Sequence, residues 1–448
     1  MKKRKMLILC CAFLFAAFFL HSQDAQQKEI EKRQMTLLYG LESDVIALLD
    51  TLIKEEDTSF SKDIFIVFEK TNNSAVKEKI FTYYRILKDY TLKPYALQIL
   101  QDPYDEKKQL VSSIFSYVAD LEIKEAAPYI TALLKNESED YFDMALSAIG
   151  KVGGADDAVF LAEYLKTGDL SIARKQSLMR SLGQLQAVET WESLVEIVKD
   201  EDENTFVRMY AAEAIGNMKK DESVDILADL FSQQDVNLKT YAVKGLSNYT
   251  DEKAVSIILD AFKDNYYKVR LEAAAAAKKQ LLTEAVPYLI YRSENDPETA
   301  VRYACYESLG SIKNDEAKDF LKKVLENTKI NDTARAKAGA VILENTITDI
   351  YPSFKSVVKS TLKDDKLKNL RYALGKEIAK YEIIEFNDLC EEYLNHKDVA
   401  TKGIGLDIFM RNKYPSLVSV VREIASNEKE GSNQRKAKLA LEKSGILD

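Results

Sequence analysis

Residues 204–231 read NTFVRMYAAEAIGNMKKDESVDILADLF, and approximations of this segment return along most of the chain. Relative to Gly216, a basic residue lies eight positions earlier and an apolar helical segment begins about eight positions later. The equivalent positions are Lys88, Ala119, Gly150, Gly183, Gly216, Ser247, Lys278, Gly310, Leu343, Ala379, Met410 and Ser444. Because successive positions are 31 to 36 residues apart, the spacing predicts a solenoid of helical hairpins.

Each repeat contains two predicted helices. The apolar spacing of DESVDILADLF returns in DDAVFLAEYL, EAVPYLIYR and DEAKDFLKKVL, as an amphipathic helix requires. Eleven positions after the reference lies a predicted core column of Ile130, Leu161, Leu194, Leu227, Ile258, Leu289, Leu321, Phe354 and Cys390. Five positions before it lies a column of mostly small residues: Ala145, Leu178, Ala211, Ala242, Ala273, Cys305, Ala338 and Leu374. Small side chains let neighbouring helices approach closely, so each hairpin is expected to bury its apolar face against the next.

Composition agrees with this architecture. Only 15 Gly and 7 Pro occur in 448 residues, so β-hairpins and long turns are not expected. Ala, Leu, Lys and Glu, which favour helices, are abundant. The sequence therefore predicts an all-α fold.

The segments FVRMYAAEAIGNMKKDESVDILADLF, KVRLEAAAAAKKQLLTEAVPYLI and AVRYACYESLGSIKNDEAKDFLKKVL resemble HEAT repeats in the short form found in HEAT-like lyase-type modules. The likeness is most regular over residues 140–345. It implies a superhelix of about twelve antiparallel hairpins, with the helices that carry the VR segment on the concave side. The Trp, Gly-Tyr and Pro positions of tetratricopeptide repeats and the TPLH motif of ankyrin repeats are absent.

The N-terminus predicts export. Four cationic side chains precede an apolar run of 15 residues, Met6–Leu20, whereas a bilayer span needs about 20. We therefore expect a cleaved signal peptide over residues 1–23, a periplasmic or cell-envelope location, and no stable membrane span after cleavage. Almost no hydrophobic stretch precedes the LILC segment that ends at Cys10, so lipidation is not expected.

No linker rich in Pro, Gly or Ser interrupts the rest of the chain. We expect residues 24–34 to form a polar lead or a cap, and residues 35–448 to form one continuous solenoid. The signal contributes four of the 63 basic residues and none of the 72 acidic ones, so its removal moves the formal net charge from −9 to −13. Nucleic acid is not an expected partner, because binding phosphates without regard to sequence needs a basic surface.

A charged ladder runs through the repeats. Eight positions before the reference lie Lys175, Arg208, Lys239, Arg270, Arg302, Arg335, Arg371, Lys402 and Lys436. The preceding turns carry Asp169, Asp202, Asp235, Asp264, Asp296, Asp332, Asp365 and Asp398. The ladder could form a basic track for an anionic ligand. We favour a structural role instead, in which each Asp satisfies N–H groups at a helix start and pairs with a cation of its own or the adjoining repeat.

Positions seven and three before the reference share a helix face, because they are four residues apart. They supply the candidate partner-binding residues, in pairs within a repeat: Gln176 and Arg180, Met209 and Glu213, Thr240 and Lys244, Leu271 and Ala275, Tyr303 and Glu307, and Tyr372 and Lys376. Both signs of charge mix here with Met, Leu and Tyr, which suits a protein or peptide partner. The alternative is that Met209, Leu271 and Tyr303 only shield adjoining hairpins.

Catalytic chemistry is not expected. Outside the signal the only His is His396, in a polar turn, and Cys305 and Cys390 fall in core columns. The stretch GKVGGADD at 150–157 lies between two predicted helices, unlike a phosphate-binding loop after a strand. The acidic clusters lack the residue order of a calcium loop. No cofactor or metal is predicted.

The sequence thus favours a non-catalytic scaffold that binds a protein or peptide along its concave face. Two alternatives remain open. One is a structural envelope component that self-associates. The other is an enzyme of the HEAT-like lyase type, against which the lack of an acid–base group argues.

Overall fold

The computed structural model describes residues 27–167 and 170–444. Throughout these residues the regular elements are α-helices and short 3₁₀ turns, and none is a strand. This confirms the predicted all-α fold. The expected signal peptide, residues 1–23, lies outside the described residues, as does Asp169. Export therefore stays a prediction.

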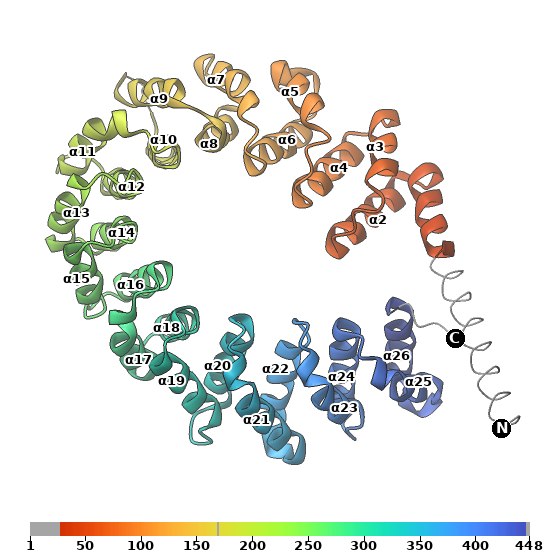
Figure 1. The fold of residues 1–448 in the computed structure, drawn as a ribbon. Helices are drawn as coiled ribbons and strands as arrows, with labels where there is room; N and C mark the ends of the chain where they lie inside the picture. Colours follow the sequence, from red (N-terminus) through yellow and green to blue (C-terminus); the bar gives the residue numbers. More distant parts are fainter. Residues whose placement is uncertain (1–26, 168–169, 445–448) are drawn as a thin grey trace, which may run out of the picture. The chain divides into compact units, whose positions relative to one another are not determined.

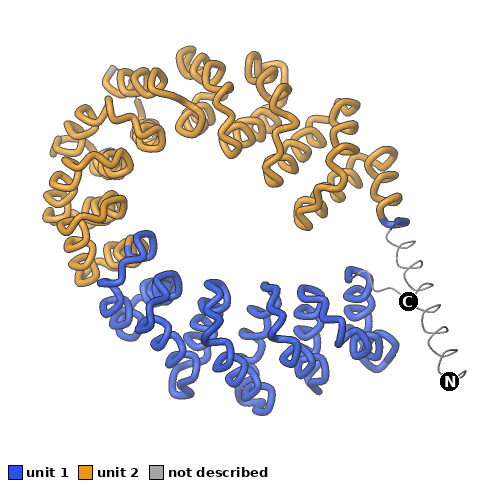
Figure 2. The backbone as a smooth tube through the Cα atoms, viewed as in Figure 1, with its two compact units in different colours: residues 1–29, 277–448 blue, residues 30–276 orange. Residues whose placement is uncertain are grey.

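Contacts divide the chain into two compact units, shown in different colours in Figure 2. Unit 2 comprises residues 30–276, and unit 1 comprises residues 277–448 with residues 1–29, each as far as the chain is described. The first described helix covers residues 27–39, a range that overlaps the expected polar lead or cap at 24–34. The predicted solenoid boundaries stay predictions.

In unit 2 the next helices are α2 (Glu42–Glu55), α3 (Ser61–Lys70), α4 (Ser74–Ile86), α5 (Lys93–Gln101), α6 (Lys108–Asp120), α7 (Ala127–Lys135), α8 (Phe142–Val152), α9 (Ala155–Thr167), α10 (Ile172–Leu185), α11 (Trp191–Lys199), α12 (Thr205–Asn217), α13 (Glu222–Ser232), α14 (Val236–Leu246), α15 (Glu252–Ala261) and α16 (Tyr267–Gln280), which runs into unit 1. Unit 1 continues with α17 (Val286–Asn295), α18 (Thr299–Ile312), α19 (Asp315–Glu326), α20 (Asp332–Glu344), α21 (Tyr351–Lys363), α22 (Lys368–Ile378), α23 (Asn387–Leu394), α24 (Val399–Asn412), α25 (Val418–Ser426) and α26 (Ser432–Lys443). The 3₁₀ turns are η1 (Pro103–Asp105), η2 (Lys124–Ala126), η3 (Val188–Thr190), η4 (Thr283–Ala285), η5 (Thr348–Ile350), η6 (Asp365–Leu367), η7 (Ile384–Phe386), η8 (Pro415–Leu417) and η9 (Glu428–Glu430).

Within each unit the helices form two rows, one of odd-numbered and one of even-numbered helices (Figure 1). An odd-numbered helix packs on the even-numbered helix that follows it, as α11 does on α12 and α17 on α18. The twelve reference positions lie within two residues of the ends of the even-numbered helices from α4 to α26. The hairpins α3–α4 to α25–α26 are therefore the twelve predicted repeats.

The two predicted columns form the core. Every residue of the column eleven positions after the reference is at most 1% exposed, from Ile130 to Cys390. The column of mostly small residues, from Ala145 to Leu374, is fully buried. These findings confirm that the hairpins hide their apolar faces against one another, as expected for a repeat array.

In unit 2 the even-numbered row is packed more tightly than the odd-numbered row. In unit 2, α12 contacts α14 more extensively than α13 contacts α15. A Cβ atom on Gly216 would collide with the Cα of Gly245 and lie 2.9 Å from its carbonyl oxygen. One on Gly183 would lie 2.9 Å from the Cα of Ala214. Because the even-numbered helices approach so closely, unit 2 curves with this row on its concave side (Figure 2).

Candidate protein-binding surface

Two arginines of the charged ladder cap the C-termini of odd-numbered helices. The Nε of Arg208 donates to the carbonyl oxygen of Val198 at 3.0 Å, and the Nε of Arg335 donates to that of Leu325, also at 3.0 Å. Both carbonyls belong to the last turn of the preceding helix in the same hairpin. Such carbonyls have no partner within the helix, so each arginine caps its own hairpin with a charge that suits a helix C-terminus.

Two other arginines bind the turn between the helices in the same way. Arg270 donates through NH1 to the carbonyl oxygens of Asp264 and Asn265, both at 2.9 Å. Arg302 donates to the carbonyl oxygens of Asp296 and Pro297. Sequence reasoning predicted Arg–Asp pairs at these positions, and the structure shows backbone carbonyls of the turn as acceptors. The guanidinium has several donors in a fixed plane and can reach carbonyls that end a neighbouring helix.

The lysines of the ladder connect successive repeats. Lys175 contacts Glu203 at 2.8 Å, and Lys239 contacts Asp264 at 3.0 Å. Each carboxylate lies in the turn of the following repeat, 28 and 25 residues further along the chain. Lys402 contacts Glu430 in the same manner. In each of these pairs, one lysine ammonium group links two neighbouring hairpins. Lys436 instead contacts Asp407 of the preceding repeat at 2.7 Å.

Most ladder aspartates also order the turn in which they lie. Asp235 accepts from the backbone N–H groups of residues 237 and 238 at 2.8 and 3.0 Å. Asp264 accepts from the N–H of Tyr266 at 2.7 Å, and Asp296 accepts from that of Glu298 at 3.0 Å. These bonds satisfy donors at helix starts. Together with the lysine pairs, they agree with a structural role for the ladder.

Asp202 departs from this role, and at the starts of α20 and η6 the N–H acceptors are Asn331 and Asp364 in place of Asp332 and Asp365. Asp202 is exposed, and Asn204 accepts from the N–H of Phe206 at 3.0 Å at the start of α12. The next residue after Asp202, Glu203, is the one that binds Lys175. The structure therefore corrects the prediction for Asp202, because the turn before α12 brings the following side chain toward the neighbouring repeat.

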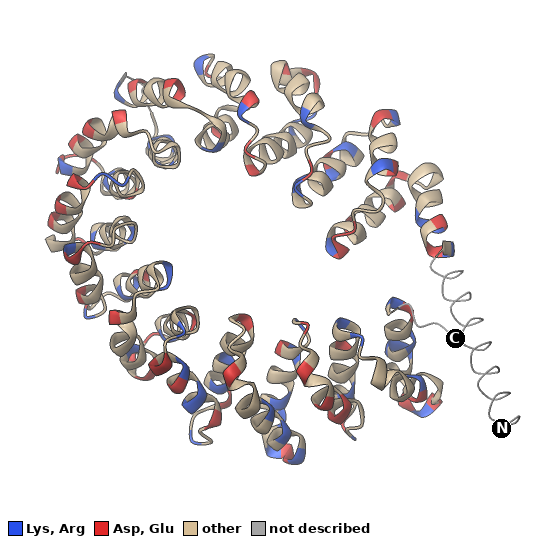
Figure 3. Cartoon of the chain, viewed as in Figure 1, with Lys and Arg blue, Asp and Glu red and all other residues tan. Residues whose placement is uncertain are grey.

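In Figure 3 the positions of basic and acidic residues are intermixed along the ribbon of each unit. Several cations on the even-numbered row already have a carboxylate partner, such as Lys244 with Glu213 and Lys337 with Glu307. This distribution of charge does not form a continuous basic track for a polyanion.

The candidate partner-binding residues differ in exposure. Arg180, Lys376 and Ala275 are exposed, and the half-buried ones are Gln176, Glu213, Lys244, Leu271, Tyr303, Glu307 and Tyr372. Met209 and Thr240 are buried, with exposures of 6% and 7%. The structure corrects the choice of these two residues, because close packing of α10, α12 and α14 covers their side chains.

The even-numbered row of unit 2 carries a connected set of aromatic and charged side chains, of which Arg180 is exposed and the others are half-buried. The guanidinium of Arg180 lies 5.1 Å from the ring centre of Tyr210. The rings of Tyr210 and Tyr241 meet edge to face, 5.3 Å apart. Lys244 lies 5.3 Å from the ring centre of Tyr241 and 2.8 Å from the carboxylate of Glu213. We call Arg180, Tyr210, Glu213, Tyr241 and Lys244 the tyrosine–cation strip.

Sequence reasoning found three members of the strip and missed Tyr210 and Tyr241. The signal was present, because each tyrosine lies three residues before a chosen residue, Glu213 or Lys244, and such residues share a helix face. The residues actually paired with them were Met209 and Thr240, one position earlier. Residues three apart and residues four apart share a helix face equally well, and the prediction used only the spacing of four.

Glu272 on α16 extends the charged part of this face. Burial raises the pKa of Glu272, Lys244 opposes the shift by attraction, and repulsion from Glu213 adds to it. The ionised carboxylate is therefore less stable in the folded protein than in the unfolded chain. The contribution of Glu272 to the free energy of unfolding is fully present below the ordinary pKa of 4.5 and is lost as the pH rises through the raised value.

Glu272→Gln is accordingly expected to raise the thermal unfolding midpoint at neutral pH, since glutamine resembles the protonated side chain. The gain should disappear below the ordinary pKa of 4.5, where glutamate is protonated in both states. Thermal melts over a pH series would measure this. Glu252→Gln, at an exposed position of α15, is the control, and an equal response of both variants would contradict the assignment.

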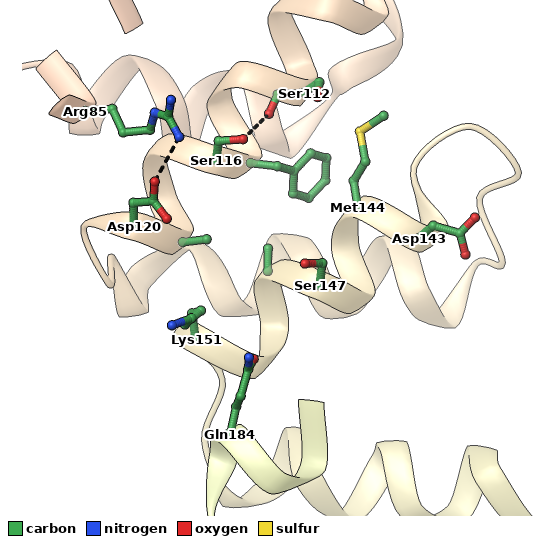
Figure 4. A pocket seen from close by; sticks show the side chains of 12 residues that line it. Arg85, Ser112, Ser116, Asp120, Asp143, Met144, Ser147, Lys151 and Gln184 are labelled. Carbon is green, nitrogen blue, oxygen red and sulfur yellow. Dashed lines mark hydrogen bonds and ion pairs between the residues drawn. The ribbon is translucent and has the colours of Figure 1, made fainter. Parts of the chain in front are cut away.

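Beside the strip lies a hollow of about 440 Å³ on α6 and α8. Figure 4 shows Ser112 and Ser116 of α6 on one side of this space and Met144 and Ser147 of α8 on the other. The half-buried or buried side chains Phe115, Ala119 and Ala148 also line it. We call this space the serine hollow.

The serine hollow and the strip meet on α10. Gln184 lines the hollow, and Arg180 lies four residues earlier, on the same face of that helix. One end of the hollow carries the ion pair of Arg85 with Asp120, 2.9 Å long (Figure 4). An apolar floor beside polar rims is typical of a binding pocket. Unit 2 thus presents a recess followed by an aromatic ridge.

In unit 1 the remaining candidates lie in separate groups. Lys337 lies 5.9 Å from the ring centre of Tyr303 and 2.6 Å from the carboxylate of Glu307. The hydroxyl of Tyr372 donates to Asp398 at 2.6 Å. Lys376 lines a hollow of about 720 Å³ with Tyr372. These groups mix charge and aromatic side chains as the strip does.

The residues considered as catalytic candidates are either hydrogen-bonded to the backbone or buried in the core. The Nδ1 of His396 accepts from the backbone N–H of Asp398 at 2.9 Å, so Nε2 carries the proton and donates to the carbonyl oxygen of Leu362 at 3.2 Å. Cys305 and Cys390 are buried in the core columns, and burial raises the pKa of Cys390. Over residues 27–167 and 170–444, no cluster of three His, Cys, Asp or Glu side chains is arranged to hold a metal ion.

A search of the same residues for membrane spans found no helix with the length and apolar character to cross a bilayer.

Comparisons with known proteins bear on the family. The family model described as spirochaete HEAT repeat protein matches residues 37–440, and no curated protein matches the chain. Among solved structures, the chain is similar to Kap121p, with 12% identity, a TM-score of 0.39, and coverage of 93% of this chain and 54% of that chain. For Kap121p bound to Pho4p, the values are 12%, 0.40, 92% and 53%. The chain thus spans about half the length of the Kap121p chains that it matches.

The complex of CpcE and CpcF of phycocyanin lyase from Nostoc sp. PCC7120 is also similar, with 14% identity, a TM-score of 0.31, and coverage of 65% of this chain and 94% of that chain. These likenesses concern the fold alone. The family model, in contrast, covers almost the whole run of stacked hairpins. The chain therefore belongs to the spirochaete HEAT repeat protein family.

Proposed function

We propose that this protein is a non-catalytic scaffold that binds a protein or peptide partner along the even-numbered helices of unit 2. The observation that carries the proposal is the tyrosine–cation strip, in which Tyr210 and Tyr241 contact each other between Arg180 and Lys244. Tyrosine and arginine dominate the energetics of protein interfaces. The strip holds these side chains in place before a partner arrives, which lowers the entropy cost of binding.

The neighbouring serine hollow offers a protein partner a second point of contact. It has a volume of about 440 Å³, and Gln184 in its lining lies on α10, the helix that carries Arg180. A polypeptide could place an apolar side chain in the recess while its adjoining segment covers the rings. Aromatic anchors beside a pocket are a common arrangement of binding hot spots.

We also propose that the protein acts outside the cytoplasm. The proposal rests on the cationic start and the apolar run Met6–Leu20 of the sequence. The acidic net charge of −9 fits a partner other than nucleic acid. N-terminal sequencing of the protein from the exported fraction would test cleavage near residue 23.

Site-specific cross-linking tests the binding surface. A photoreactive amino acid in place of Lys244 should capture a partner in the producing cells. The same residue in place of Lys263, an exposed lysine of the turn after α15, should not. Equal capture at both positions would refute the proposed surface. Capture of a second copy of the same chain at position 244 would replace the scaffold by the self-associating alternative.

Once the partner is identified, its affinity for purified variants measures the role of the strip. Tyr210→Ala combined with Tyr241→Ala should weaken binding by about 10-fold to 100-fold, as for truncation of central aromatic anchors. Tyr291→Ala, which removes a tyrosine that is 59% exposed on α17, is the matched control. An unchanged dissociation constant in a double variant that melts normally would show that the strip does not bind the partner.

A further inference from the structure

One interface in unit 1 departs from the charge pattern of the ladder. At Lys175, Lys239 and Lys402 the turn of the following repeat provides a carboxylate. The turn before α20, residues 327–331, reads NTKIN and contains a lysine but no acid. The nearby Asp332 contacts Arg335 of its own helix at 3.6 Å. The preceding ladder residue, Arg302, therefore faces a turn without the usual carboxylate.

A hollow of about 690 Å³ lies at this interface, between the starts of α18 and α20. Three cations line it, Arg302, Lys323 and Lys329, against one carboxylate, Glu294. Tyr303 and Tyr306 form an aromatic wall, with ring centres 6.4 Å apart. Tyr306 is fixed from behind, because its ring stacks on Phe320 at 6.2 Å. We call this space the basic hollow.

The three cations of the basic hollow are not neutralised by the described part of the chain. Arg302 donates to neutral acceptors: the carbonyl oxygens of Asp296 and Pro297 and, at 2.6 Å, the hydroxyl of Thr299. Lys323 and Lys329 are exposed, and neither forms an ion pair with any residue that the structure describes. Positive charge thus collects in one recess of a chain whose net charge is −9. Such a recess attracts an anionic group.

We propose that the basic hollow binds an acidic segment of a polypeptide partner, with a side-chain carboxylate of that segment between Lys323, Lys329 and Arg302. The carboxylate would take the place that Glu203, Asp264 or Glu430 occupies at the other interfaces. The aromatic wall of Tyr303 and Tyr306 would pack against the apolar part of the same segment. The inference deepens the proposed scaffold function and rests on it, but it concerns a different surface, in unit 1.

The charges favour a carboxylate-bearing peptide over a polyanion. Glu294 lies in the rim, and the acidic chain repels an extended phosphate backbone. Recessed, oriented cations bind carboxylates through charge-assisted hydrogen bonds. A short acidic segment can enter the recess without running along the acidic surface around it.

The test is the binding of fluorescein-labelled octaglutamate to the purified protein, followed by fluorescence anisotropy. Octaglutamate should bind, and octalysine with the same label should not. Lys323→Ala combined with Lys329→Ala should weaken binding of octaglutamate by about 3-fold to 20-fold, the effect of removing two partly exposed ion pairs. The matched control is Lys313→Ala combined with Lys322→Ala, which removes the same charge from exposed positions that do not line the hollow.

Equal weakening by both double variants would overturn the inference, since it would show attraction by overall charge alone. Failure of octaglutamate to bind the unmodified protein would overturn it as well. Inorganic phosphate at matched ionic strength should displace the peptide no better than chloride does. Complete displacement by phosphate would instead indicate a general oxyanion site. Because cross-linking at position 244 reports on unit 2, the scaffold proposal can survive when this inference fails.

Discussion

Arg371→Ala is expected to lower the free energy of unfolding by about 3–5 kcal/mol, the range for breaking a buried charged network. Arg371 is completely buried. Its NH1 donates to the carbonyl oxygen of Thr361 at 2.9 Å and its Nε donates to the hydroxyl of Thr401 at 2.9 Å. Alanine would leave both acceptors buried without a donor, and would also leave a cavity the size of the lost side chain.

Urea denaturation followed by far-ultraviolet circular dichroism would measure the loss. Because repeat arrays can unfold in parts, hydrogen exchange should also show faster opening of α21 to α24, which surround the lost side chain. Lys397→Ala is the control, since the side chain of Lys397 is 80% exposed and its ammonium group contacts Asp365 at 3.2 Å. This control should change the stability by less than about 0.5 kcal/mol. Equal stability of the two variants would mean that Arg371 does not hold α21 to α24 together.

Gly216→Ala is expected to destabilise unit 2 by about 1–3 kcal/mol, the usual cost of overfilling a packed site. The added methyl group would meet the backbone of Gly245, including its carbonyl oxygen at 2.9 Å. Backbone atoms cannot move aside as a flexible side chain can, so α12 and α14 must separate. Alanine gains about 1 kcal/mol over glycine within a helix, so we expect the net loss at the lower end of this range.

Gly154→Ala separates crowding from the general effect of a methyl group, because a Cβ atom at Gly154 would meet nothing within 4 Å. Thermal melts of both variants give the comparison, and small-angle X-ray scattering would show whether the separation of α12 from α14 changes the dimensions of the protein. A Gly216→Ala variant as stable as Gly154→Ala would contradict the close approach of the even-numbered helices.

The repeat and its core could be predicted because they depend on local periodicity. The column that includes Leu227 and the column that includes Ala211 recur at a fixed distance from each reference position. A helix with such spacing has one apolar face, and the neighbouring repeat supplies the surface that covers it. Both residues are fully buried.

The contacts of the ladder were less predictable than its residue types. Arg208 and Lys239 occupy the same repeat position, yet Arg208 binds the carbonyl oxygen of Val198 and Lys239 binds the carboxylate of Asp264. The choice depends on donor geometry and on which acceptor the neighbouring turn presents. A pattern of charges along the chain does not contain that information.

The binding surface shows which features the sequence alone does not determine. From its own periodicity the chain specifies helices, their pairing into hairpins and the residues that must be hidden, because each of these follows from spacing along one helix. Met209 and Tyr210 differ by one position, about 100° around the helix, and their neighbours decide which of the two reaches the surface. Met209 is buried because α10, α12 and α14 pack so closely. That distance depends on contacts such as Gly216 with Gly245, between residues of different repeats, and it exists only once the hairpins have stacked.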